Sequence, residues 1–180
     1  LLLFGHLPTQ LQLARWNEDI VHHRRIKFKI VDLLKCLPEQ GHPMDALQAA
    51  VAALGMFYPG RNVQDIENNY WSAVRLVAKL PTIVAAWARL RHGNEYIPPR
   101  DDLGFSENFL YMLTETEPLP LWGNIFDDCL VLHAEHTMNA STFAGMVTAS
   151  TLADPYTVVA SSIGALKGPL HGGANEEVVM

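Results

Sequence analysis

The segment 168–177, GPLHGGANEE, places a single histidine between a Gly-Pro turn and two glycines, just ahead of an expected helix. Pro169 fixes the approach of the chain, while Gly172 and Gly173 let the backbone come close to a small ligand. The amides in the first turn of a helix have no partner inside the helix, so they can bind an anion. Their partial positive charge also disfavours protonation of His171. The segment therefore predicts a neutral His171 that donates a hydrogen bond to a developing oxyanion.

Two further histidines, His133 and His136, lie three residues apart at the end of another expected helix. Such a pair shares one helix face or converges on one ligand. One interpretation is a metal site, although it needs further ligands and the HExxH pattern is absent. A second is that both imidazoles simply satisfy a helix C-terminus. The polar residues that follow, including Asn139 and Ser141, favour a third interpretation, a site for an organic ligand.

Other catalytic classes find little support in the sequence. A nucleophilic hydrolase would need a GxSxG elbow, which is missing, and neither cysteine has electropositive neighbours along the chain. Lys167-Gly168-Pro169 does not follow the order of a phosphate-binding P-loop. Gly172-Gly173 follows no expected strand, so it is weak evidence for a dinucleotide site.

Composition narrows the class of protein further. The 180 residues are 49% apolar and 18% charged, which is typical of a globular chain, and the net charge of −6 argues against nucleic acid as the main partner. We interpret the basic run 22–29 as a solvated helix end. No apolar run approaches the roughly 20 residues of a membrane span. Cys36 and Cys129 lie in apolar runs, so we expect buried free thiols and a reducing, cytoplasmic location.

Nearly every periodic segment indicates a helix, so the predicted fold class is all-α and multi-helical. Thr9 is the expected N-cap of the first helix, and Ser106 could cap another, without a capping box because Phe109 stands where a Glu would be needed. Pro81 either kinks one long helix or separates two. The expected ranges are about 10–23, 27–37, 44–58, 63–80, 82–91, 106–113, 122–134, 141–152 and 155–166. The range 44–58 is alanine-rich and apolar on most sides, which predicts burial against other helices.

Taken together, these residues resemble the citrate synthase family. The resemblance rests on five segments in order and spans essentially the whole chain. They are LFGHLPT at 3–9, HPMD at 42–45, FSENFLYM at 105–112, HAEH at 133–136 with NAST at 139–142, and GPLHGGANE at 168–176. The last two are specific in combination. The histidine segment is closer in style to prokaryotic members than to mitochondrial ones.

The resemblance implies a helical large domain, a smaller mobile domain, and a homodimer with active sites near the subunit interface. It implies an acyltransferase of the tricarboxylic acid cycle that condenses acetyl-CoA with oxaloacetate and water to give citrate and CoA. Acetyl-CoA is then a co-substrate, and no cofactor or metal is expected. A 2-methylcitrate synthase that uses propionyl-CoA is an alternative within the same class.

The resemblance also implies residue roles. His171 matches the catalytic histidine that hydrogen-bonds the acetyl-CoA carbonyl and stabilises its enol, and His136 matches the histidine that holds oxaloacetate. Ser141 would help to orient His171. The predicted substrate-binding positions besides His136 are His133, Asn139, Ser141 and Gly172. The role of His171 agrees with the chemistry, because the α-proton of a thioester is removed readily only if a positioned hydrogen-bond donor stabilises the negative charge that builds on the carbonyl oxygen.

Compared with the family pattern, the chain stops at Met180, before the aspartate base, a further histidine and the carboxylate-binding arginines. We therefore expect residues 1–180 to be a large-domain segment that folds but does not turn over alone. Two alternatives come from other classes: a metal-dependent hydrolase that uses His133 and His136, and a helical interaction module without chemistry. Subunit contacts are expected from the apolar helix after His42 and the small-residue helix after Asn139.

Overall fold

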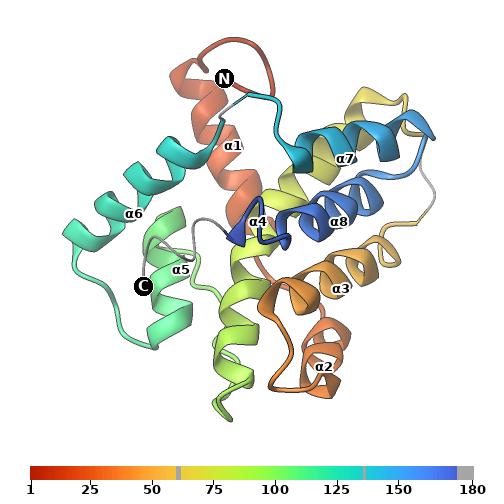
Figure 1. The fold of residues 1–180 in the computed structure, drawn as a ribbon. Coiled ribbons are helices and arrows are strands. Elements are labelled where there is room, and N and C mark those ends of the chain that lie inside the picture. Colours follow the sequence, from red (N-terminus) through yellow and green to blue (C-terminus); the bar gives the residue numbers. More distant parts are fainter. Residues whose placement is uncertain (60–61, 136, 174–180) are drawn as a thin grey trace.

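The structure is a computed structural model that describes residues 1–59, 62–135 and 137–173; within these ranges it contains eight helices and no strand (Figure 1). The all-α prediction is confirmed. The helices are α1 (Gln10–His23), α2 (Phe28–Cys36), α3 (Pro43–Gly55), α4 (Ile66–Leu90), α5 (Phe105–Thr114), α6 (Pro120–His133), α7 (Ala140–Ser150) and α8 (Pro155–Leu166).

The long helix α4 is the centre of the fold. It contacts α1, α2, α3, α5 and α8, whereas α6 packs mainly on α5 and α7 packs on α8 (Figure 1). The helices α6 and α7 are therefore outer elements with one covered side each. The connection between them carries the histidine segment 133–136.

The two alternatives for Pro81 are resolved in favour of one helix, since α4 runs without a break from Ile66 to Leu90. Pro81 has no N–H, so the carbonyl of Val77 loses its helical donor. Val77 is 37% exposed, and at that position solvent can supply the missing hydrogen bond. The proline is tolerated because it falls on the open side of α4.

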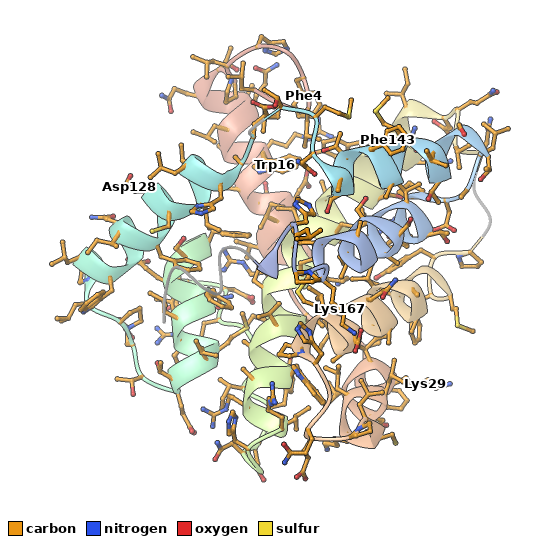
Figure 2. The ribbon with its side chains drawn as sticks, in the orientation of Figure 1. Phe4, Trp16, Lys29, Asp128, Phe143 and Lys167 are labelled. Carbon is orange, nitrogen blue, oxygen red and sulfur yellow. The ribbon has the colours of Figure 1, made fainter. Side chains whose placement is uncertain are left out.

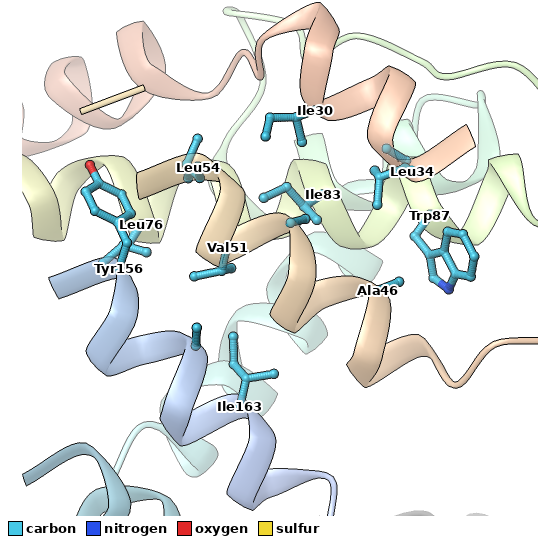
Figure 3. Close-up of a cluster of buried hydrophobic side chains, with 13 residues drawn as sticks. Ile30, Leu34, Ala46, Val51, Leu54, Leu76, Ile83, Trp87, Tyr156 and Ile163 are labelled. Atoms are coloured by element: carbon cyan, nitrogen blue, oxygen red, sulfur yellow. The ribbon is translucent and has the colours of Figure 1, made fainter. Parts of the chain in front are cut away.

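The core is built around α3, whose apolar composition predicted burial against other helices. Its Ala50, Val51 and Leu54 are at most 1% exposed. They pack between α4 and α8 in one cluster, shown in Figure 3, which includes Ile30, Leu34, Leu76, Ile83, Trp87, Tyr156 and Ile163. The prediction for α3 is confirmed. This packing fixes α8, and α8 leads directly into the loop that carries His171.

The start of α5 differs from the prediction. Gly104 is the N-cap, and its backbone amide donates to Glu107 Oε2 at 3.1 Å. Ser106 caps nothing; it is 1% exposed and its hydroxyl donates to the Asp127 carboxylate on α6. Serine is a common N-cap, so the sequence suggested Ser106 as the N-cap of α5. Glu107, three positions after Gly104, indicated the correct N-cap better.

The basic run 22–29 is more than a solvated helix end, which corrects the sequence interpretation. Arg24 is 4% exposed, and its guanidinium donates to the carbonyl oxygens of Arg100 at 3.0 Å and Leu103 at 2.8 Å. It ties the end of α1 to the loop before α5. Sequence alone gave no hint of this, because the two acceptors are backbone atoms far along the chain.

A second buried cation, Lys79 of α4, is 4% exposed. It donates to the carbonyl oxygens of His23 at 2.5 Å and Arg25 at 2.6 Å, at the end of α1. Burial, followed by the nearby charges of Lys27 and Arg75, lowers the pKa of Lys79 from 10.5 to about 8. The folded chain therefore holds this proton less tightly than the unfolded chain does.

We expect the free energy of unfolding to rise between about pH 7.5 and pH 9, by on the order of 1 kcal/mol. In this window the unfolded chain keeps the Lys79 proton while the folded chain releases it, so raising the pH favours the folded state. Denaturant titrations of the chain at the two pH values measure the change. In the variant Lys79→Met the rise should disappear; an equal rise in both proteins would contradict the assignment to Lys79.

The two cysteines are free, as expected, but both are exposed rather than buried. Cys36 is the last residue of α2, and Cys129 lies on the uncovered side of α6. Trp122 on α6 is likewise 57% exposed. An apolar run indicates a helix, but it does not say whether a neighbour covers the helix within the same chain. No helix in the described ranges is both long and apolar enough to cross a membrane.

Candidate active site

His171 is held on a tight loop that folds back on the end of α8. Its amide donates to Gly168 O at 2.9 Å, and the amide of Gly172 donates to Leu166 O at 3.0 Å. A Cβ on Gly172 would lie 2.2 Å from Leu166 O, so only glycine permits this approach. The glycine thus shapes the loop that presents the imidazole. The helix expected after His171 falls mainly on residues 174–180, which lie outside the described residues.

The imidazole of His171 meets a hydroxyl from the first turn of α7. Its Nε2 lies 2.7 Å from Ser141 Oγ, and the same hydroxyl is 2.9 Å from the carbonyl oxygen of Ser162 on α8. Ser141 and His171 are both half-buried. The predicted contact between these two residues is thus present, and it brings together two motifs that are 30 positions apart.

The hydroxyl of Ser141 has one proton and two neighbours that can accept it. If the proton goes to the Ser162 carbonyl, His171 must donate from Nε2, and its neutral form then carries no proton on Nδ1. If the proton goes to Nε2, the neutral imidazole carries its proton on Nδ1 and can donate from there. The direction of this one hydrogen bond therefore decides whether the other ring nitrogen acts as a donor or as an acceptor.

His133 and Asn139 lie at the two ends of the connection between α6 and α7. His133 Nδ1 is 2.7 Å from the Cys129 carbonyl, so this nitrogen carries a proton and donates it. Asn139 is the N-cap of α7, with its side-chain oxygen accepting from the Thr142 amide at 2.9 Å. Each side chain is thereby fixed by one bond to a helix end. Among the described residues, no hydrogen bond involves the other ring nitrogen of His133 or the side-chain nitrogen of Asn139.

These side chains line a common cleft of about 300 Å³ at the meeting point of α6, α7 and α8. Four of the predicted site residues take part in it, and Gly172 follows directly in the loop. His136 lies outside the described residues. The lining residues are His133, Asn139, Ser141, Thr142, Ser162, Leu166 and His171. None of these seven carries a carboxylate, so this wall supplies hydrogen-bond donors rather than an acidic base.

Ser162 is the contact that the sequence did not indicate. It acts through its backbone carbonyl, which every residue type possesses, so no residue pattern could single it out. Only the packing of α7 on α8 places that carbonyl 2.9 Å from Ser141 Oγ.

The family comparison decides what this cleft belongs to. The model of the family described as citrate synthase, C-terminal domain, matches residues 1–180. The chain belongs to the citrate synthase family. It is 59% identical to a citrate synthase of Synechocystis over 99% of this chain and 45% of that protein. It is 50% identical to a citrate synthase of Acidithiobacillus ferridurans over 99% of this chain and 48% of that protein.

The fold agrees with that membership. The crystal structure of citrate synthase from Pyrobaculum aerophilum superposes with a TM-score of 0.90 at 44% identity, over 98% of this chain and 46% of that one. The chain thus spans about half the length of the citrate synthases it matches. The resemblance drawn from the five sequence motifs is confirmed.

A larger hollow, of about 670 Å³, lies between the first residues and α1. It is mainly apolar; Phe4 and Trp16, labelled in Figure 2, form part of its wall with ring centroids 6.3 Å apart. None of the described residues for which the citrate synthase resemblance implied a role lines it. The smaller cleft beside His171 is therefore the candidate site.

The cleft does not support a metal site at His133 and His136. Across the part of the chain that the structure describes, no three His, Cys, Asp or Glu side chains lie close enough together to hold an ion. His133 is exposed, with one ring nitrogen already committed to Cys129. A metal site would depend on His136, which lies outside the described residues.

Proposed function

We propose that the protein carrying this chain condenses acetyl-CoA with oxaloacetate and water to give citrate and CoA. The observation that carries the proposal is the His171 imidazole, 2.7 Å from Ser141 Oγ in a half-buried cleft that His133 and Asn139 also line. The 59% identity to a citrate synthase of Synechocystis supports the same activity. The proposal concerns the whole protein, since the chain spans about half the length of its relatives.

In the proposed reaction, His171 donates a hydrogen bond from Nδ1 to the thioester carbonyl of acetyl-CoA. This requires the Ser141 proton to point at Nε2 rather than at the Ser162 carbonyl. A carboxylate from outside this wall removes the α-proton while negative charge builds on the carbonyl oxygen that His171 faces. The nucleophilic α-carbon then attacks the ketone carbon of oxaloacetate, and the ketone oxygen takes up a proton to become a hydroxyl. Water hydrolyses the thioester to release CoA.

Oxaloacetate is assigned to the side of the cleft formed by the connection between α6 and α7. There His133 and Asn139 present polar nitrogens at fixed positions. To donate from Nε2 as well as from Nδ1, His133 must be the imidazolium, a form that also attracts the substrate's carboxylates. We propose that His136 and Gly172 complete the binding site. We further propose that residues 1–180 are the large-domain part of the enzyme.

An assay of CoA release tests the activity. The full-length protein should release CoA from acetyl-CoA only when oxaloacetate is present, and the 180-residue chain alone should not. Comparison with propionyl-CoA distinguishes a 2-methylcitrate synthase, which would prefer the longer acyl group. Stoichiometric zinc or iron in the purified protein, with no CoA release, would favour the metal-dependent hydrolase instead. A protein that neither releases CoA nor contains a stoichiometric metal would favour the helical interaction module.

We propose that the protein is a homodimer and that α7 forms part of the contact. Phe143, Met146 and Val147 on α7 are 62%, 55% and 53% exposed, and Figure 2 shows Phe143 on the outer side of this helix. Apolar side chains grouped in this way mark an interaction surface. The other sequence candidate, α3, has its apolar face already covered by α4 and α8. Light scattering of the full-length protein should give twice the mass of one chain.

We propose a cytoplasmic location. Two free cysteines are consistent with a reducing compartment. The most similar relatives reported above are prokaryotic enzymes.

A further inference from the structure

One face of α7 carries Ser141, Gly145 and Thr148, spaced four and three residues apart, so that they form a row along the helix. The row faces α8. Ser141 Oγ lies 2.9 Å from Ser162 O, and Thr148 Oγ1 donates to Ser161 Oγ at 2.8 Å. Gly145 is buried between these two contacts. It therefore lies in the interface between the two helices.

The space at Gly145 is occupied by the residue that holds Ser141. A Cβ on Gly145 would lie 2.6 Å from Ser162 Oγ and 3.6 Å from Val158 Cγ1. The first distance is shorter than van der Waals contact, so Ser162 or the helix that carries it would have to move. The carbonyl of Ser162 is one of the two partners of the Ser141 hydroxyl, and the other is His171 Nε2. A side chain at position 145 would thus act on the group that orients His171.

We propose that Gly145 is a positioning residue for the condensation. By having no side chain, it lets α8 approach α7 closely enough for Ser141 to reach both the Ser162 carbonyl and His171. Gly145 is not among the residues that line the cleft, and it acts through Ser162 and Ser141. The inference rests on the proposed function, because it assigns Gly145 a part in that turnover.

Stability and activity should respond differently to a change at Gly145. Alanine is a better helix former than glycine, so Gly145→Ala does not weaken α7 itself. A displacement of reacting groups by a fraction of an ångström, in contrast, lowers the rate directly. A purely structural role would lower stability and activity together.

Gly164 on α8 provides a matched control. A Cβ there would lie 2.7 Å from Gln48 Nε2, nearly the same distance as at Gly145. That atom is the end of a flexible side chain on α3, which can move aside without disturbing either helix. Gly145 and Gly164 are both helical glycines that meet a polar side chain of a neighbouring helix. At position 145 the new Cβ meets Ser162, which holds Ser141, whereas at position 164 it meets Gln48, which is not among the residues that line the cleft.

The test compares steady-state kinetics of the full-length protein and its variants. In Gly145→Ala we expect kcat to fall about tenfold, with KM for oxaloacetate within about twofold and the thermal midpoint lower by no more than about 5 °C, so that the protein stays folded in the assay. In Gly164→Ala, kcat should stay within about twofold of wild type. When Ser162→Ala is the starting protein, adding Gly145→Ala should lower kcat less than about twofold, because the atom that the new Cβ meets is gone.

Three kinetic results would overturn the inference. The first is a wild-type kcat in Gly145→Ala, which would mean that Ser162 rotates freely. The second is an equal loss of kcat in Gly164→Ala. The third is that Gly145→Ala lowers kcat as much in the Ser162→Ala background as in the wild type. The ¹⁵N shift of His171 Nε2 tests the same contact without turnover, and it should change in Gly145→Ala but not in Gly164→Ala. An unchanged shift in Gly145→Ala refutes the positioning role. A changed shift in a protein that releases no CoA supports it and refutes only the proposed reaction.

Discussion

Replacing His171 with alanine is expected to lower kcat for CoA release by about 10²–10³-fold in the full-length protein, which is the usual cost of removing one oxyanion donor. The imidazole lies 2.7 Å from Ser141 Oγ, which fixes its ring toward the cleft. Because the charge on the thioester oxygen is largest in the transition state, the loss should appear in kcat rather than in KM. Steady-state assays with acetyl-CoA and oxaloacetate measure both constants.

His92 is the control for this variant. Its Nδ1 is 2.7 Å from the Ala88 carbonyl, and it is exposed at the end of α4, away from the candidate cleft. His92→Ala removes a histidine that caps a helix end but touches none of the proposed machinery, so kcat should stay within about twofold. A His171→Ala protein that keeps more than a tenth of the wild-type kcat would show that the donor is another group.

Features of the fold were predictable from the sequence where residues close together along the chain determine them, as for the burial of a helix or its N-cap. The apolar run in α3 predicted burial, and Ala50 and Val51 are fully buried. Thr9 and Asn139 are N-caps because short polar side chains can reach the amides of the next turn. The pairing of Ser141 with His171 followed from the family resemblance, since residue types alone gave no distance between two motifs so far apart in sequence.

The predictions failed where distant parts of the chain decide the outcome. Arg24 looked like part of a solvated helix end, yet carbonyls some 76 to 79 positions away draw its guanidinium inward. Cys129 looked buried because its neighbours are apolar, but among the described helices α6 packs mainly on α5, and Cys129 is exposed. Ser162 contributes a backbone carbonyl, which leaves no mark in the sequence. In each case the missing information is which element lies opposite.

The second large effect is expected at Gly172. In Gly172→Ala, the new Cβ would lie 2.2 Å from Leu166 O and 2.9 Å from Leu166 Cδ1. A backbone atom cannot rotate away, so the loop has to open and lose the bond from the Gly172 amide to Leu166. The imidazole of His171, one residue earlier, then moves relative to Ser141. Since a misplacement of about 1 Å can cost about 10²-fold in rate, we expect a loss of that order in kcat.

Gly173 makes this prediction specific to loop geometry, because a Cβ there would meet its nearest atom among the described residues, Gly168 O, at 3.5 Å. That is ordinary contact, so Gly173→Ala should keep kcat within about threefold of wild type. Equal losses in both variants would mean that the pair of glycines acts by general flexibility and not by the approach of Gly172 to α8. A loss confined to Gly172→Ala, together with a changed ¹⁵N shift of His171, would show that the end of α8 aims the catalytic imidazole through one backbone contact.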